Sequence, residues 1–96
     1  MTLEGKIAVV TGSTSGIGLG IATALARQGA SIMLNGFGDA AAIEKERAGL
    51  AAEFGVEVAF DPADLSKAEE VRRLVAAAEA RFGRVDILVN NAGIQY

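Results

Sequence analysis

Four short apolar runs alternate along this chain with three stretches of helical spacing, and this alternation is the strongest constraint on its fold. The apolar runs are residues 6–11, 31–35, 56–60 and 86–90. A glycine follows each helical stretch, at positions 29, 55 and 83. Strands that alternate with helices pair in parallel through right-handed crossovers. The sequence therefore predicts a β-α-β-α-β-α-β portion of a doubly wound α/β sheet, with strand order 3-2-1-4.

The helical stretches carry apolar stripes and end signals. The stripes contain Ile17, Ile21, Ala24, Leu25 and Gln28, then Ile43, Arg47, Leu50, Ala51 and Phe54, and then Val71, Leu74, Val75, Ala78 and Phe82. Asp39 is expected to cap the second helix. Ser66 and Glu69 have the spacing of a capping box at the start of the third helix. Asp61 is expected to belong to the turn before that helix.

Composition excludes several classes of function. Hydrophobic residues make up 51% of the 96 residues, so a packed core is expected. The chain has no cysteine and no histidine, so thiolate and imidazole metal ligands, disulfides and histidine-based catalysis are excluded. A net charge of -3 gives no electrostatic footprint for nucleic acid. We expect a cytoplasmic protein, because the sequence contains neither a secretory leader nor an apolar stretch that could span a membrane.

A glycine-rich loop joins the first strand to the first helix. It reads Thr11-Gly12-Ser13-Thr14-Ser15-Gly16-Ile17-Gly18. The backbone N–H groups at such a helix start suit an anionic pyrophosphate. Gly12 would permit a tight turn, and Gly16 and Gly18 a close backbone approach. The hydroxyls of residues 13–15 would donate to phosphate or ribose oxygens. The alternative is a turn that only connects strand to helix. ATP or GTP hydrolysis is not expected, because the loop lacks the P-loop lysine.

Three motifs together resemble those of the short-chain dehydrogenase/reductase family. They are the glycine loop, Asp64-Leu65 after the third strand, and Asn90-Asn91-Ala92-Gly93 after the fourth. This resemblance implies a Rossmann-type domain that binds NAD or NADP and transfers a hydride to or from a carbonyl or alcohol carbon.

The resemblance also implies roles for single residues of the second and third motifs. Asp64 would accept a hydrogen bond from the adenine amino group, and Leu65 would support the ring. Asn90 would lie against the adenosine ribose, while Ala92 and Gly93 would leave room for the cofactor. The alternatives are a turn aspartate at position 64 and strand termination at Asn90-Asn91.

The segment after the second strand bears on the choice of nucleotide. It reads Asn35-Gly36-Phe37-Gly38-Asp39, and the acidic residue that usually follows the strand directly and binds the ribose hydroxyls is absent. Asp39 is expected to cap the helix rather than to bind the ribose. It also lacks lysine and arginine, as does the loop at 13–15, and a 2′-phosphate without a cation is unfavourable. We therefore expect NAD as the cofactor. Phe37 would either cover the adenine face or anchor the loop on the next helix.

Residues 35–39 and 90–95 resemble a subgroup of the family, the bacterial D-3-hydroxybutyrate dehydrogenases. That subgroup interconverts 3-hydroxybutyrate and acetoacetate with NAD. The resemblance implies that Gln95 binds the substrate carboxylate, for which its amide N–H groups are suitable donors. Tyr96 departs from the histidine expected next. The alternative within the family is a reductase for sugars or 3-oxoacyl thioesters.

The Tyr-x-x-x-Lys pair of the family does not occur in these 96 residues, whose single tyrosine is Tyr96. We therefore expect residues 1–96 to be the NAD-binding N-terminal part of a single Rossmann domain. The catalytic remainder would lie outside this chain, which would be inactive by itself. The resemblance implies a homotetramer for the parent protein. The alternative is a stand-alone, non-catalytic nucleotide-binding module.

Overall fold

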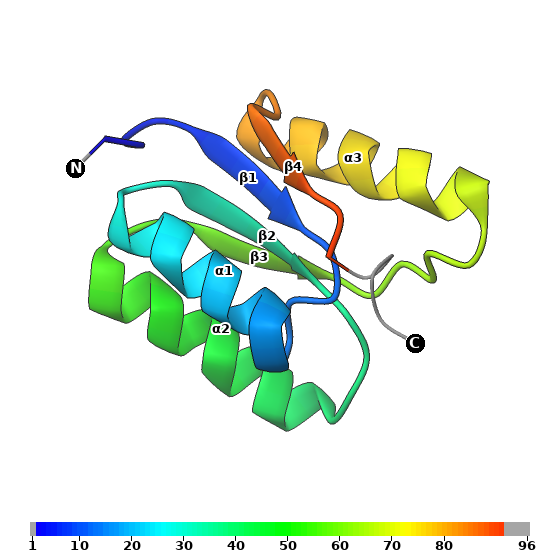
Figure 1. The fold of residues 1–96 in the computed structure, drawn as a ribbon, viewed down its shortest axis with the longest axis horizontal. Coiled ribbons are helices and arrows are strands. Elements are labelled where there is room, and N and C mark those ends of the chain that lie inside the picture. The colour runs from blue at the N-terminus through cyan, green and yellow to red at the C-terminus, as the bar shows by residue number, and fades with distance from the viewer. Residues whose placement is uncertain (1, 92–96) are drawn as a thin grey trace.

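The computed structural model describes residues 2–91. Strands and helices alternate along the chain as predicted (Figure 1). The elements are β1 (Ile7–Val10), α1 (Gly16–Arg27), β2 (Ser31–Asn35), α2 (Ala40–Phe54), β3 (Val58–Asp61), α3 (Ala68–Phe82) and β4 (Ile87–Val89).

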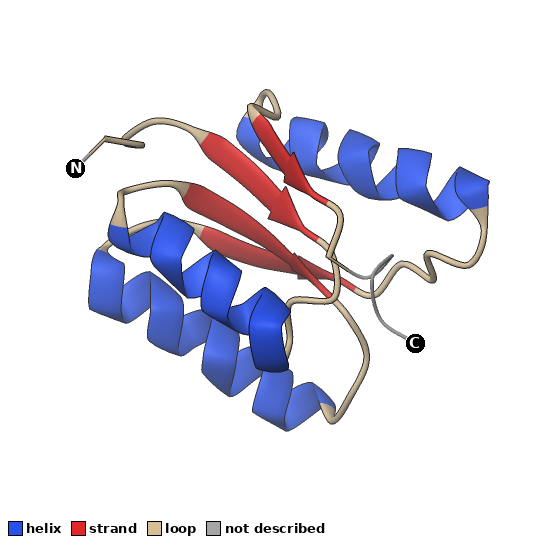
Figure 2. Ribbon diagram, in the orientation of Figure 1, coloured by secondary structure: helices blue, strands red, loops and turns tan. Residues whose placement is uncertain are grey.

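The four strands form one sheet in the order β3-β2-β1-β4, and every neighbouring pair is parallel. This confirms the predicted order and the Rossmann-type architecture. Helices α1 and α2 lie on one face of the sheet and α3 lies on the other (Figure 2). Strand β1 therefore has β2 on one side and β4 on the other, and the point where the order reverses lies between β1 and β4.

Two apolar layers hold the helices against the sheet, because successive side chains of a strand point to opposite faces. On one face Val10 and Leu34 pack with Ala22 and Ala26 of α1, and α2 adds Leu50. The other face is built from Val9, Met33, Ala63, Leu74 and Ala78, the last two from α3. Ala22 and Ala26 have no exposed surface, so this helix approaches the sheet closely.

The end signals of α2 act as predicted. The backbone N–H of Ala42 donates to the Asp39 carboxylate at 2.9 Å, so Asp39 is the N-cap. Gly55 and Gly83 close α2 and α3 in the left-handed conformation, with φ of 65° and 92°.

The predicted capping box at α3 is wrong. The N-cap is Lys67, whose side chain makes no capping bond. The backbone N–H of Ser66 donates instead to the Asp64 carboxylate at 3.0 Å, which closes a turn ahead of the helix. Strand β3 also begins two residues later than predicted and includes Asp61, which was expected in the turn.

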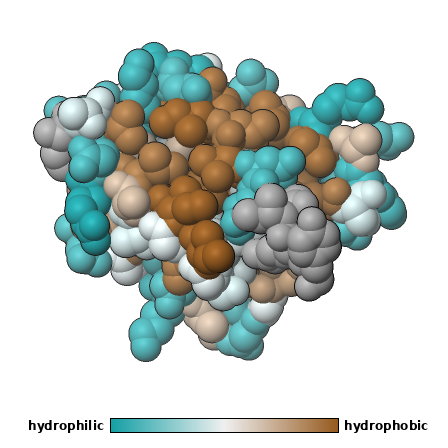
Figure 3. Space-filling model, in the orientation of Figure 1, coloured by the Kyte–Doolittle hydropathy of each residue, from teal (hydrophilic) through white to brown (hydrophobic). Residues whose placement is uncertain are grey.

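The outer strand β4 is the least covered strand, and Leu88 at its centre is 51% exposed. Hydrophobic atoms gather on the face seen in Figure 3, over β1, β4 and the N-terminal end of α1. Within residues 2–91, no helix has the length and apolar character needed to cross a membrane.

Candidate functional site

The loops that follow β1, β2 and β3 enclose a cavity of about 220 Å³ at the carboxyl edge of the sheet. Ligands of doubly wound sheets bind at this edge, next to the point where the strand order reverses. The lining residues are Gly12, Thr14, Ser15, Asn35, Gly36, Phe37, Ala63 and Leu65. Of the site residues predicted from the sequence, five lie in this lining: Gly12, Thr14, Ser15, Phe37 and Leu65.

The three glycines of the loop differ in their surroundings. Gly12 and Gly16 are in the left-handed region, with φ of 59° and 58°. A Cβ on Gly16 would have no atom within 4 Å, whereas a Cβ on Gly18 would lie 2.0 Å from the Gly12 carbonyl oxygen. The Gly16 backbone is thus open to a ligand, while Gly18 lets α1 pack directly against the loop.

The N-terminal end of α1 has the character of an anion site. Ser15 is the N-cap, but its side chain makes no capping hydrogen bond, and the first turn contains no acidic residue. The N–H groups of a first turn lack partners within the helix and carry partial positive charge. Ile17 on this turn is 71% exposed, so the turn is accessible from solvent.

The three hydroxyl residues of the loop do not share one role. Thr14 and Ser15 line the cavity, and the Thr14 hydroxyl donates to the Phe37 carbonyl at 3.2 Å. Ser13 is fully buried beneath the lining. Its hydroxyl donates to the Val10 carbonyl at 2.6 Å and accepts from the Asn35 N–H at 2.9 Å. The prediction that the Ser13 hydroxyl donates to phosphate or ribose is therefore wrong, because these bonds direct the hydroxyl into the protein.

Asn35, the last residue of β2, is a site residue that the sequence analysis did not single out. Its Oδ1 accepts from the Gly12 N–H at 3.2 Å. Its Nδ2 donates to the carbonyls of Asp61 at 3.0 Å and Ala63 at 3.1 Å. The residue is 2% exposed and belongs to the cavity lining. A polar amide that ends an apolar, buried strand was the available signal.

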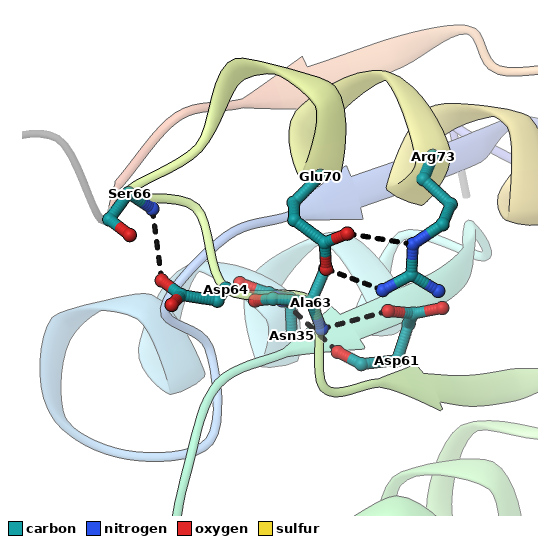
Figure 4. A network of polar contacts seen from close by, with 7 residues as sticks. All are labelled: Asn35, Asp61, Ala63, Asp64, Ser66, Glu70 and Arg73. Carbon is teal, nitrogen blue, oxygen red and sulfur yellow. Dashed lines mark hydrogen bonds and ion pairs between the residues drawn. The ribbon is translucent and has the colours of Figure 1, made fainter.

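The loop after β3 is held by a network of carboxylates (Figure 4). The Asp61 carboxylate accepts from the Ala63 N–H at 2.9 Å. The hydrogen bonds from Ser66 hold the pKa of Asp64 below its usual value, so that carboxylate is ionised. On α3, the bond from Arg73 likewise lowers the pKa of Glu70. Asp64 thus fills the turn role that was the alternative prediction, and adenine recognition stays a prediction.

Phe37 is 70% exposed at the cavity, on the loop after β2. This exposure contradicts the alternative in which the ring anchors its loop on the next helix, since an anchoring ring would be buried. The remaining prediction, in which the ring covers an adenine face, is compatible with this position.

The segment after β4 reaches the glycine loop. The Thr11 hydroxyl donates to Asn90 Oδ1 at 3.3 Å, and Asn91 Nδ2 donates to the Gly12 carbonyl at 3.2 Å. Asn91 is 2% exposed, and its Oδ1 has no hydrogen-bond partner among residues 2–91. The predicted residues Ala92, Gly93 and Gln95 lie outside the described part of the chain. Within the described part, no cluster of three or more acidic side chains could hold a metal ion.

A family model, described as short chain dehydrogenase, matches residues 6–96. The chain belongs to the short-chain dehydrogenase family. A D-beta-hydroxybutyrate dehydrogenase of Cupriavidus necator is 58% identical over 94 residues, which are 98% of this chain and 36% of the relative. A protein of the same name from Rhizobium meliloti is 50% identical over 94 residues, which are 95% of this chain and 35% of that protein.

Solved structures of the family agree with the fold. L-sorbose reductase from Gluconobacter frateurii, in complex with NADPH and L-sorbose, superposes with a TM-score of 0.87 at 40% identity. The match covers the whole of this chain and 37% of the reductase. The chain therefore spans about a third of the length of these three relatives.

Proposed function

We propose that this chain is the cofactor-binding part of an NAD-dependent dehydrogenase that interconverts 3-hydroxybutyrate and acetoacetate. The observation that carries the proposal is the cavity at the carboxyl edge of the sheet, bounded by the glycine loop and the uncapped start of α1. The identity to the two relatives named D-beta-hydroxybutyrate dehydrogenase supports the choice of substrate.

The residues present fit the two chemically different parts of such a cofactor. The open backbone at Gly16 and the first turn of α1 would hold the pyrophosphate. The cavity between Phe37 and Leu65 would hold the adenosine. Its volume of about 220 Å³ is below the roughly 300–1,000 Å³ that enclose a whole drug-sized ligand, which suits a part of a dinucleotide.

Preference for NAD over NADP is part of the proposal. The lining among residues 2–91 contains no lysine or arginine, so a 2′-phosphate would have no cationic partner there. The cavity lining contains no acidic residue either. An acidic side chain could not replace the buried Gly36 without colliding with Thr14, since a Cβ there would be 2.5 Å from the Thr14 hydroxyl oxygen. Recognition of the ribose hydroxyls would therefore rest on neutral groups.

The reaction would also need groups beyond residues 2–91. When bound, the cofactor supplies the hydride acceptor, and Gln95 would donate to the substrate carboxylate. The family's Tyr-x-x-x-Lys pair would come from a segment that follows this chain. By itself the chain would bind NAD without turning over substrate. For the parent protein we propose a homotetramer, from the resemblance, and a cytoplasmic location.

Calorimetric titration of the chain with NAD and NADP tests the cofactor proposal. We expect NAD to bind measurably and more tightly than NADP, and Gly16→Val to weaken NAD binding. Absence of NAD binding by a folded chain, or equal affinity for both nucleotides, would contradict it.

The substrate proposal is tested on the protein that the whole gene encodes. We expect its sequence to contain a Tyr-x-x-x-Lys pair after Tyr96. We also expect NADH formation with D-3-hydroxybutyrate, and no oxidation of NADH or NADPH with L-sorbose, the substrate of the sugar-reductase alternative. A stop codon after Tyr96 would support the stand-alone module, and turnover of the sugar would support the alternative reductase.

A further inference from the structure

We propose that Asn35 is a positioning residue whose side-chain amide sets the spacing between the glycine loop and the segment of residues 61–65. The inference rests on the proposed function, in which these two segments hold the pyrophosphate and the adenine. It concerns a residue that need not touch the cofactor's reacting end, and it acts through the backbone groups that it holds.

The side-chain amide of Asn35 bonds through its oxygen and through both of its N–H groups. Its oxygen accepts from Gly12, and its two N–H groups donate to Asp61 and Ala63. An asparagine amide offers two donors and one carbonyl oxygen, so these three bonds engage both N–H groups and the oxygen. Because the residue is 2% exposed, water cannot readily replace a partner that is lost.

The sheet order explains why this bridge begins on β2. Strand β2 lies between β1 and β3, so its carboxyl end is adjacent both to the glycine loop after β1 and to the loop after β3. Asn35 is the last residue of β2, and the partners of its side chain are 23 residues earlier and 26 and 28 residues later. Gly12 and Ala63, at the two ends of the bridge, both line the cavity.

The backbone of Asn35 is held in place by Ser13. The Ser13 N–H donates to the Asn35 carbonyl at 2.6 Å, and the Asn35 N–H donates to the Ser13 hydroxyl at 2.9 Å. These two bonds tie the backbone of Asn35 to the glycine loop, so the position of Asn35 relative to that loop is fixed. A change in the amide would therefore move residues 61–65 relative to the glycine loop, because the loop stays bonded to the backbone of Asn35.

Asn35→Asp separates positioning from packing, because the carboxylate has nearly the same shape. It still accepts from Gly12, but it presents an oxygen to the two carbonyls that Nδ2 now binds at 3.0 and 3.1 Å. Protonation restores one donor. Burial and the facing carbonyls favour the protonated form, so its pKa would be raised.

The experiment is calorimetric titration of the 96-residue chain with NAD across a pH series, for the wild type, Asn35→Asp and the control Gln28→Glu. The control makes the same amide-to-acid change at an exposed position whose side chain accepts from Thr2. We expect Asn35→Asp to weaken NAD binding by about tenfold or more at neutral pH, as two donors to buried acceptors are lost. Binding should recover as the pH is lowered, while the wild type and control change little.

The outcomes distinguish the inference from the proposed function. A folded wild type that binds no NAD overturns both. A wild type that binds NAD, with Asn35→Asp binding equally well at neutral pH or failing to recover in acid, overturns the inference alone. If Asn35→Asp does not fold, Asn35→Ser replaces it without adding a charge. The same loss of NAD affinity, now independent of pH, supports the inference. Wild-type affinity, or a second unfolded variant, overturns it.

Discussion

Gly18→Ala should destabilise the chain, although alanine is the better helix former. Gly18 lies in the first turn of α1, and a Cβ at this position would be 2.0 Å from the Gly12 carbonyl oxygen and 2.7 Å from Asn91 Nδ2. The first of these is a backbone atom, which cannot rotate away. Either α1 or the glycine loop must therefore move.

The magnitude follows from two opposing terms. Replacing glycine by alanine in a helix gains up to about 1 kcal/mol. Overpacking a tight contact costs about 1–3 kcal/mol, and a contact this short with backbone belongs at the upper end. The net loss of unfolding free energy is therefore about 1–2 kcal/mol. For a chain of this size, such a loss lowers Tm by roughly 4–16 °C.

Gly20→Ala is the matched control, because it makes the same change in the same helix where no atom lies within 4 Å of the added Cβ. It should gain up to about 1 kcal/mol. Urea unfolding followed by far-ultraviolet circular dichroism measures both variants against the wild type. A Gly18→Ala chain as stable as the wild type, or a Gly20→Ala chain destabilised as strongly, would refute the steric argument.

Three further predictions concern other positions. Gly16→Val should weaken NAD binding by at least about 1–3 kcal/mol in calorimetry, because its side chain would fill the open space over the loop. Asp39→Ala should lower the unfolding free energy by about 1 kcal/mol in urea titration, through loss of the α2 cap. The bonds from the Ile7 N–H and Arg84 hold the pKa of Asp86 below its usual 3.8, so the stability that they add is present above that pH and is lost as pH falls through the lowered value. Acid unfolding curves of Asp86→Asn should therefore depend less on pH in this window, and an unchanged slope would contradict the assignment.

The fold was predictable because its signals are local. The β-branched run of β1, the glycines that end each helix, and the Asp39 cap all act on residues within a few positions of themselves. The failed capping box shows where local signals compete. Asp64 and Ser66 both have side chains that favour turns. The Asp64 carboxylate accepts from the Ser66 N–H in the turn ahead of α3, so Ser66 is not the N-cap of that helix.

The candidate site was less predictable because its decisive bonds join distant residues. Ser13 and Asn35 are 22 residues apart, and each has a side chain that could equally face solvent in a turn. Only the parallel pairing of β1 with β2 brings the two together, which buries the serine hydroxyl and aligns the amide with β3. Sequence patterns identified which loops line the cavity, but the division between ligand-facing and structural polar groups depends on the assembled sheet.

The three glycines of the loop are needed for different physical reasons. Gly12 is required by its φ of 59°, and its carbonyl accepts from Asn91. Gly18 is required by contact with that same carbonyl. Neither requirement involves a ligand, so both would apply to the empty fold. At Gly16 the surrounding space is open, and its φ of 58° costs an L-residue about 1–2 kcal/mol. Gly16 thus shares the backbone requirement of Gly12, but a side chain there would extend into open space, where it would meet a ligand rather than the protein.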